Sequence, residues 1–255
     1  MQPIRSLTAH CTLSHNAAGQ PLLTIDNGDA KAEISLFGAH VLRYQRHGEP
    51  ASIWLSDKAV LDGSKPIRGG IPVCWPWFGP APARVGSGKP SHGFARTTLW
   101  TLDGVSDHGD GTLVHLSLPD NESTRALWPH PFELELDVLI GKELSLVLTT
   151  RNTGKAAVVY NAALHTYLQI SAPEAVSVTG LGEPYADKLT GQDGQQQGAL
   201  TLTAAIDRVY HQAEAMADMS NDGYRTMLCV EAAITAEAGV VIAPDEEHSL
   251  STVII

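Results

Sequence analysis

The sequence has no uninterrupted apolar run of eighteen or more residues, the length that a membrane-spanning helix requires. No apolar segment of the kind found in secretory signal peptides follows Met1. Its three cysteines, Cys11, Cys74 and Cys229, are an odd number without a CxxC spacing, which argues against a disulfide framework and a structural zinc site. We therefore expect a cytoplasmic protein that does not associate with membranes.

Motifs for metal ions and nucleotides are also missing. None of the eleven histidines stands in an HxH, HxxxH or HExxH arrangement, so a metal site would need ligands from distant parts of the chain. The chain has no GxGxxG or Walker loop for nucleotide phosphates and no GxSxG elbow of a serine hydrolase. We therefore predict neither a metal ion nor a cofactor.

Positive charge is scarce as well. The formal net charge is -11, which argues against nucleic acids and anionic membranes as partners, because both require a basic surface. The same charge is unfavourable for the binding of any anion. However, seventeen lysines and arginines remain, and two or three of them in one cleft are enough to bind a phosphate.

What the chain has in abundance is the alternation of apolar and polar residues that is typical of strands. Residues 30–36 alternate in this way, and residues 132–149 form two alternating segments around Gly141, which predicts an antiparallel hairpin. Further strand-like runs cover residues 112–118, 158–170, 226–232, 239–243 and 249–255. Helical periodicity is limited to 121–128 and 212–219, segments too short to connect parallel strands. We expect an all-β protein, a large antiparallel β-sandwich with few short helices.

The domain organisation follows from length and pattern. A chain of 255 residues is long enough for one large core, and it contains no repeat or linker that would divide it. The first twenty residues show no sustained period, and we interpret them as an arm that leads into the first strand. We predict a single domain over residues 1–255.

One segment differs from this strand pattern. Residues 68–96 read RGGIPVCWPWFGPAPARVGSGKPSHGFAR, with five prolines and no room for a long regular element. Trp75 and Trp77 offer flat faces suited to sugar rings, and Arg68 and Arg96 offer planar donors suited to an anion. Three glycines would allow the backbone to approach a ligand closely: Gly69, Gly70 and Gly93. This composition predicts a polar, aromatic pocket that binds an anion.

The same residues also carry a family resemblance. RGGIPVCWPWFGP is followed in order by SHGFAR, Trp100, ALHTYLQIS, DRVY and CVEAA. This combination resembles the D-hexose-6-phosphate mutarotases, the glucose-6-phosphate 1-epimerase branch of the aldose 1-epimerase superfamily. The similarity runs from about Asp26 to about Ala233, most of the chain. It implies the galactose mutarotase-like supersandwich fold.

Two ionisable residues stand inside otherwise apolar runs, His165 in VVYNAALHTYLQI and Glu231 in MLCVEAA. A buried carboxylate is costly unless it has a partner, and a buried imidazole can hold or give a proton near neutral pH. Either residue taken singly could instead be a satisfied core histidine or an outward-facing glutamate. The resemblance implies that the two are the catalytic pair.

The reaction implied by the resemblance is the interconversion of the α and β anomers of an aldohexose 6-phosphate. Glu231 would take the proton of the C1 hydroxyl while His165 protonates the ring oxygen, which opens the ring to the free aldehyde. Rotation about C1–C2 and reclosure on the other face complete the cycle. No redox change occurs, so this chemistry requires no cofactor.

The resemblance also implies substrate ligands. Arg68 and Arg96 would bind the phosphate and hydroxyl groups, His92 a sugar hydroxyl, and Asp207 in DRVY another hydroxyl. Each has an ordinary alternative: the arginines could be solvated or form structural ion pairs, and His92 and Asp207 could stabilise turns.

Several neighbouring residues have uncertain roles at this stage. Ser91 occupies a place where some relatives carry a longer polar side chain. Lys89 is close enough in sequence to join a phosphate site, although a solvated loop lysine is the alternative. For Trp75, Trp77 and Phe78 we favour packing for at least two of the three.

The chain departs from the family pattern between DRVY and SNDGYRTMLCVE, where relatives usually carry several tens of residues more. We hypothesise that a segment is missing near residues 210–212, because the loss of strands would expose apolar edges. A second class of function therefore remains open, a phosphosugar-binding or regulatory protein without turnover. A third is an aldose 1-epimerase of unphosphorylated sugar, against which the arginine pair argues. Our expected partner is an aldohexose 6-phosphate bound by a monomer.

Overall fold

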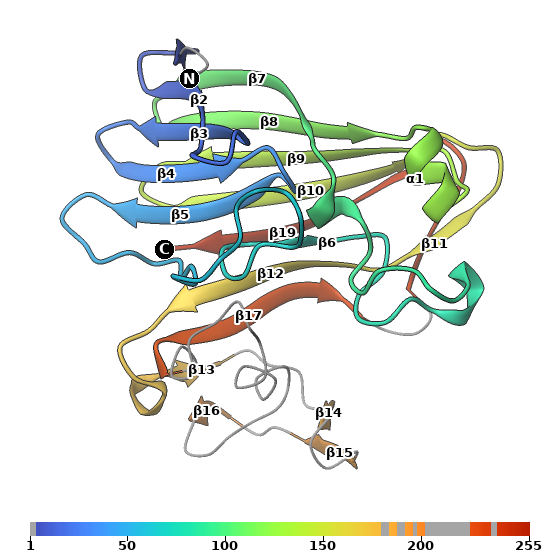
Figure 1. The fold of residues 1–255 in the computed structure, drawn as a ribbon. Coiled ribbons are helices and arrows are strands. Elements are labelled where there is room, and N and C mark those ends of the chain that lie inside the picture. The colour runs from blue at the N-terminus through green and yellow to red at the C-terminus, as the bar shows by residue number, and fades with distance from the viewer. Residues whose placement is uncertain (1–3, 180–183, 188–191, 196–197, 202–224, 236–238) are drawn as a thin grey trace.

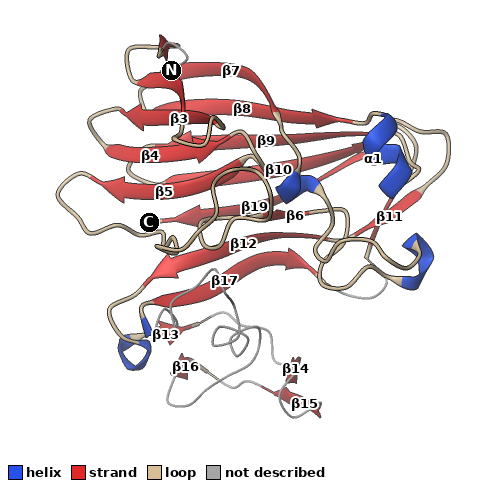
Figure 2. Ribbon diagram, in the orientation of Figure 1, coloured by secondary structure: helices blue, strands red, loops and turns tan. Residues whose placement is uncertain are grey.

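The computed structural model describes residues 4–179, 184–187, 192–195, 198–201, 225–235 and 239–255. Strands and loops make up nearly all of the described chain (Figure 2). Its helical elements are all short: α1 (Glu122–Leu127) and the 3₁₀ turns η1 (Ala83–Val85), η2 (Ala95–Thr97) and η3 (Pro173–Ala175). No helix of these ranges is long and apolar enough to cross a membrane.

Two five-stranded antiparallel sheets dominate the described residues (Figure 1). The first has the order β1 (Arg5–Ser6), β2 (Cys11–His15), β3 (Pro21–Asp26), β4 (Ala30–Ser35) and β5 (His40–Arg46). The second has the order β19 (Glu247–Ile254), β10 (Leu144–Asn152), β9 (Phe132–Ile140), β8 (Gly111–Pro119) and β7 (Thr101–His108).

A third, three-stranded sheet has the order β17 (Met227–Ile234), β12 (Ala162–Gln169) and β6 (Val73–Cys74). Smaller strand pairs complete the described part of the chain: β11 (Val158–Tyr160) with β18 (Val240–Ile242), β13 (Ser177–Val178) with β16 (Leu200–Thr201), and β14 (Pro184–Asp187) with β15 (Gln192–Gln195).

The core forms where the apolar faces of the two large sheets meet. In β9 every second residue is buried, from Phe132 to Ile140, as its alternating sequence predicts. The buried residues of β9 and β10 belong to the same apolar cluster as Leu23, Ile25 and Ile34 of the first sheet. This packing of sheet on sheet is the arrangement of a β-sandwich.

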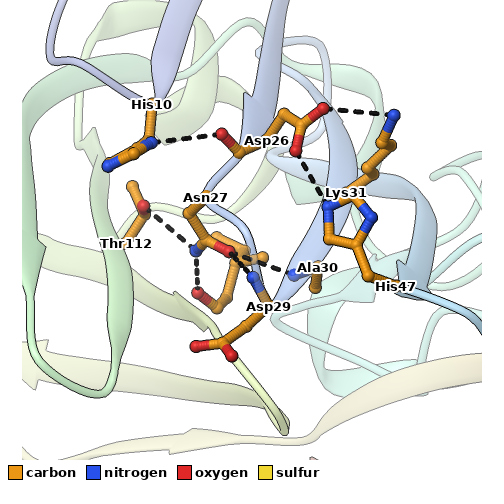
Figure 3. A network of polar contacts seen from close by, with 9 residues as sticks. His10, Asp26, Asn27, Asp29, Ala30, Lys31, His47 and Thr112 are labelled. Carbon is orange, nitrogen blue, oxygen red and sulfur yellow. Dashed lines mark hydrogen bonds and ion pairs between the residues drawn. The ribbon is translucent and has the colours of Figure 1, made fainter.

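A polar network also connects the two large sheets (Figure 3). The side-chain amide of Asn27 donates to Thr112 Oγ1 at 3.2 Å and to the carbonyl oxygen of Ile140 at 2.6 Å. Beside it, Asp26 contacts Lys31 Nζ at 3.1 Å and His47 Nε2 at 2.9 Å, and His47 is the first cause of the lowered pKa of Asp26. The turn after β3 therefore links the first sheet to β8 and β9.

Most of the predicted elements are confirmed. The hairpin predicted over residues 132–149 is β9 and β10, and the short helix predicted at 121–128 is α1, whose Asn121 side chain caps the first turn. The strand-like run at 158–170 forms two strands, β11 and β12, which are separated by Asn161. The helix predicted at 212–219 lies outside the described residues.

The interpretation of the first twenty residues as an arm is wrong. They contain β1, an edge strand of the first sheet, and β2, which lies between β1 and β3, and Cys11 of β2 is buried in the core. β2 is held by regular antiparallel pairing with β3, from Cys11 opposite Ile25 to His15 opposite Pro21. Strands this short carry too few residues for their period to stand out in the sequence.

The loop of residues 68–96 lies beside β12. The main-chain N–H of Tyr167 donates to Gly70 O and that of His165 to Pro72 O, both at 3.0 Å. Further along, Cys74 of β6 pairs with Ala163 of β12. Backbone hydrogen bonds therefore fix the start of the loop against the strand that carries His165.

Two glycines of this loop are required by the packing of the protein itself. Gly70 and Gly93 both have positive φ angles, where glycine is favoured over other residues. A Cβ on Gly70 would lie 2.4 Å from His40 Nε2, and one on Gly93 only 1.9 Å from the carbonyl oxygen of Trp75. The glycines therefore allow the protein to pack closely against itself, and the prediction that they let the backbone approach a ligand stays a prediction.

Candidate functional site

His165 and Glu231 lie directly opposite each other on neighbouring strands, β12 and β17. The two strands run side by side in Figure 1. His165 Nε2 lies 3.2 Å from Glu231 Oε1, and the two side chains are only 7% and 10% exposed. Cross-strand pairing thus joins two residues that are 66 positions apart in the sequence.

The contact between them is a short polar contact that involves a neutral imidazole. Burial, together with the neighbouring charges of His92, Arg96 and Arg68, lowers the pKa of His165 to about 3. At neutral pH the ring is therefore uncharged, so its contact with the carboxylate is not a full ion pair. Nδ1 of the same ring is buried and has no hydrogen-bond partner among the described residues.

His92 comes from the loop and approaches His165 edge-on, with ring centroids 6.0 Å apart. The main-chain N–H of Gly79 donates to His92 Nδ1 at 3.2 Å, so a neutral His92 carries its proton on Nε2. Phe78 packs against both rings, with centroids 4.7 Å from His92 and 6.3 Å from His165. His92, as a potential donor, and the apolar ring of Phe78 therefore both lie beside His165.

Two guanidinium groups complete the cluster. Arg68 Nη1 donates to the hydroxyl of Tyr167 at 3.1 Å, and Arg96 Nη2 donates to the carbonyl oxygen of Ser91 at 2.9 Å. Burial lowers the pKa of Arg96, and the positive charge of Arg68 acts in the same direction. Both arginines are also close enough to His165 to disfavour its charged form. The structure thus brings two cations together beside one carboxylate.

Comparison with known proteins identifies the family of the chain. The sequence pattern of the family described as Aldose 1-epimerase matches residues 21–214. The chain belongs to the aldose 1-epimerase family. It is 33% identical over 264 residues to an Escherichia coli (strain K12) protein named "Putative glucose-6-phosphate 1-epimerase", an alignment that covers 89% of this chain and 87% of the relative. A Salmonella typhimurium (strain LT2) protein of the same name is 33% identical over 247 residues, covering 82% of each chain.

Solved structures agree with the family assignment. A crystal structure of a "putative mutarotase" from Salmonella typhimurium superimposes with a TM-score of 0.88 at 27% identity, covering 98% of this chain and 95% of the other. The galactose 1-epimerase of Lactobacillus acidophilus NCFM has a TM-score of 0.71 at 12% identity and shows a shared fold. The predicted all-β, galactose mutarotase-like fold is confirmed. This family member is an epimerase with a mutarotase role, and the alternative of a binding protein without turnover is not supported.

Other predicted residues of this family member lie in the core or away from the His165–Glu231 pair. Trp75 and Trp77 are buried, and their indole N–H groups donate to Thr150 Oγ1 and to the carbonyl oxygen of Pro90. Packing is therefore the role of both, as we favoured for two of the three aromatic residues. Their predicted use as sugar-binding faces is wrong, because both rings are enclosed.

Ser91 and Lys89 also have their places. Ser91 accepts a hydrogen bond from Arg96 through its main-chain oxygen, and its hydroxyl donates to Gly79 O at 3.2 Å. Lys89 Nζ donates to the carbonyl oxygen of Ala126 at the end of α1, at 2.7 Å, and is exposed there. Lys89 is therefore held at the helix end. Asp207 and the segment near residues 210–212 lie outside the described residues.

Two residues of the candidate site were missed by the sequence reasoning. Tyr167 stacks on His165 and accepts from Arg68. Its signal was its position two residues after His165, because alternate residues of a strand share one face. His40 is fully buried, and its Nε2–H donates to Gly69 O at 2.7 Å, beside Arg68. No pattern in the sequence around His40 indicates this contact.

Proposed function

We propose that this protein interconverts the α and β anomers of glucose 6-phosphate and related aldohexose 6-phosphates by acid–base ring opening and reclosure. The observation that carries the proposal is the buried His165–Glu231 pair, with its 3.2 Å contact, facing the charges of Arg68 and Arg96. An acid and a base serve proton transfer, and two cations serve an anionic group on the same substrate.

The reaction requires one proton to leave C1–OH and another to reach the ring oxygen. Glu231, as a carboxylate, takes the proton from C1–OH, and His165 delivers its proton to the ring oxygen as the C1–O5 bond breaks. The product is the open aldehyde with a free 5-hydroxyl. After rotation about C1–C2, the aldehyde is attacked from its other face and both protons return, so the enzyme ends as it began.

The proton on His165 needs an explanation, because a neutral imidazole is a poor acid. Burial and the charges of His92, Arg96 and Arg68 all disfavour the imidazolium in the free enzyme. A phosphate bound between the two arginines would cancel part of this positive field and thereby favour protonation of His165. The substrate's own phosphate would in this way prepare the acid that opens its ring.

Local charge supports a phosphorylated substrate over a neutral sugar. The whole chain has a formal net charge of -11, which repels anions at long range. At the site, however, positive charges lie close together. Arg68 disfavours the charge of Arg96, and both arginines disfavour a charge on His165. An incoming anion relieves this repulsion, whereas a neutral sugar does not.

The test is anomer exchange measured by NMR magnetisation transfer between the α and β C1 protons of glucose 6-phosphate. Wild-type protein should accelerate exchange, and His165→Gln and Glu231→Gln should each abolish the acceleration while retaining the wild-type melting temperature. Acceleration for free glucose alone would overturn the phosphate assignment and favour an aldose 1-epimerase of unphosphorylated sugar. Full activity in both variants would remove the acid–base pair from the mechanism.

A further inference from the structure

Tyr167 contacts both parts of the candidate site, His165 of the buried pair and Arg68 of the arginine pair. It lies two residues after His165 on β12, so both side chains extend from the same face of the strand. The two rings stack nearly parallel, with centroids 4.9 Å apart and an interplanar angle of 12°. Tyr167 also stacks on Trp54, at 6.0 Å and 26°. The plane of the His165 imidazole is therefore set by a ring that is itself packed in place.

The hydroxyl of Tyr167 contacts the other half of the site. Arg68 Nη1 donates to it at 3.1 Å, and burial raises the pKa of Tyr167, so the phenol keeps its proton. A phenol that accepts from Arg68 directs its own proton elsewhere. It can therefore add a second donor to an anion that Arg68 binds.

The backbone around Tyr167 keeps these contacts in register. Its N–H donates to Gly70 O at 3.0 Å, its carbonyl accepts from Trp54 N at 2.9 Å, and Gly70 N donates to Trp54 O at 2.7 Å. Gly69, next to Arg68, also forms an isolated bridge with Leu55. The segment that carries Arg68 is thus tied on both sides to the segment that carries Tyr167.

We propose that Tyr167 is a positioning and specificity-determining residue: its hydroxyl orients Arg68 toward the substrate's phosphate, and its ring holds the plane of His165. The proposal rests on the proposed function, because it assumes a phosphate at Arg68. In this proposal, Tyr167 couples the recognition of the phosphate by Arg68 to acid catalysis by His165.

Two variants separate this role from a loss of stability. Tyr167→Phe removes the hydroxyl and keeps the stacked ring. Tyr44→Phe is a matched control, because Tyr44 is also buried and its hydroxyl donates to Gly141 O at 2.9 Å, away from the site. Both variants would be compared with wild type in anomer exchange of glucose 6-phosphate and of free glucose, and in the binding of inorganic phosphate by calorimetry.

We expect Tyr167→Phe to raise KM for glucose 6-phosphate about tenfold with kcat changed about twofold or less, because a hydrogen bond to a charged group is lost. Its affinity for inorganic phosphate should fall by a similar factor, its rate with free glucose should fall less, and Tyr44→Phe should match wild type in all three. Equal losses with both sugars, or unchanged phosphate affinity, would overturn the inference.

Failure of the proposed function is a separate outcome. If the wild type does not accelerate exchange of glucose 6-phosphate but binds inorganic phosphate, a weaker affinity in Tyr167→Phe supports the Tyr167 inference while the proposed reaction is lost. If the wild type turns over glucose 6-phosphate and Tyr167→Phe does so equally well, the reaction stands and the inference is overturned. If the wild type binds no inorganic phosphate and does not distinguish the two sugars, both are overturned.

Discussion

The β9–β10 hairpin and the β12–β17 pair are both antiparallel, yet they distribute their side chains differently. Along β9, buried residues alternate with exposed or half-buried ones from Phe132 to Ile140. Along β12, six consecutive residues from Ala162 to Tyr167 are buried, among them His165 and Thr166. β9 therefore has one face for the core, whereas β12 is covered on both faces. The second arrangement lets a strand carry functional side chains without exposing them to solvent.

The largest expected effect is on catalysis at β17. Glu231→Gln keeps the size of the side chain but removes the base, so kcat for glucose 6-phosphate should fall by roughly 10²–10⁴. The melting temperature should stay close to that of wild type. Glu135→Gln on β9 is the matched control, a glutamate of the β9–β10 hairpin at an exposed position, and it should leave kcat unchanged. A fall of less than about tenfold in Glu231→Gln would argue against general base catalysis by this residue.

A substitution in the β9–β10 hairpin should have the opposite effect, with stability lost and KM unchanged. Leu136 is fully buried in the core, and Leu136→Ala should lower the free energy of unfolding by about 2–5 kcal/mol because it leaves a cavity. The folded fraction should retain the wild-type KM. Denaturant unfolding and anomer exchange on the same preparation would show both. A changed KM with unchanged stability would contradict the view that the β9–β10 hairpin stabilises the fold and the β12–β17 pair carries the site.

Acid should destabilise the protein through the buried histidine next to the site. Burial lowers the pKa of His40 to about 4, whereas the unfolded chain binds this proton near the ordinary value of 6.5. The unfolded state therefore gains protons first as pH falls. Stability contributed by neutral His40 is full above pH 6.5 and is lost progressively down to about pH 4, by about 3 kcal/mol.

Unfolding measured between pH 7 and pH 4 would check this. His40→Gln should reduce the pH dependence, whereas His10→Gln, at an exposed histidine, should leave it unchanged. Equal slopes for wild type and His40→Gln would assign the acid sensitivity to other groups. His165 should add to the effect in the same direction, because burial lowers its pKa to about 3.

The smallest predicted effect concerns substrate discrimination. Arg68→Ala and Arg96→Ala should each lower kcat/KM for glucose 6-phosphate by about tenfold more than for free glucose, because under the proposed function each removes a charged hydrogen bond to the phosphate. Arg43→Ala removes a surface arginine that pairs with Glu33 on the first sheet and should affect neither substrate. Equal losses for the two sugars would rule out a phosphate role for the arginines.

The sequence predicted many strands of the β-sandwich and part of the candidate site. Strands such as β4, β8, β9 and β10 were found because a period of two is a local signal that becomes visible over their six to nine residues. His165 and Glu231 stood out as ionisable residues inside apolar runs. The short β1 and β2 were missed because they contain too few residues to show a period.

The sequence by itself determined the all-β class, the core positions of the long strands and the set of residues able to transfer protons or bind an anion. Only the tertiary structure decided that His165 meets Glu231 across β12 and β17, that Trp75 is core, and that Tyr167 contacts both His165 and Arg68. The physical reason is range. Strand formation depends on neighbours one or two residues away, whereas these contacts depend on the register of strands and loops that are distant in the chain.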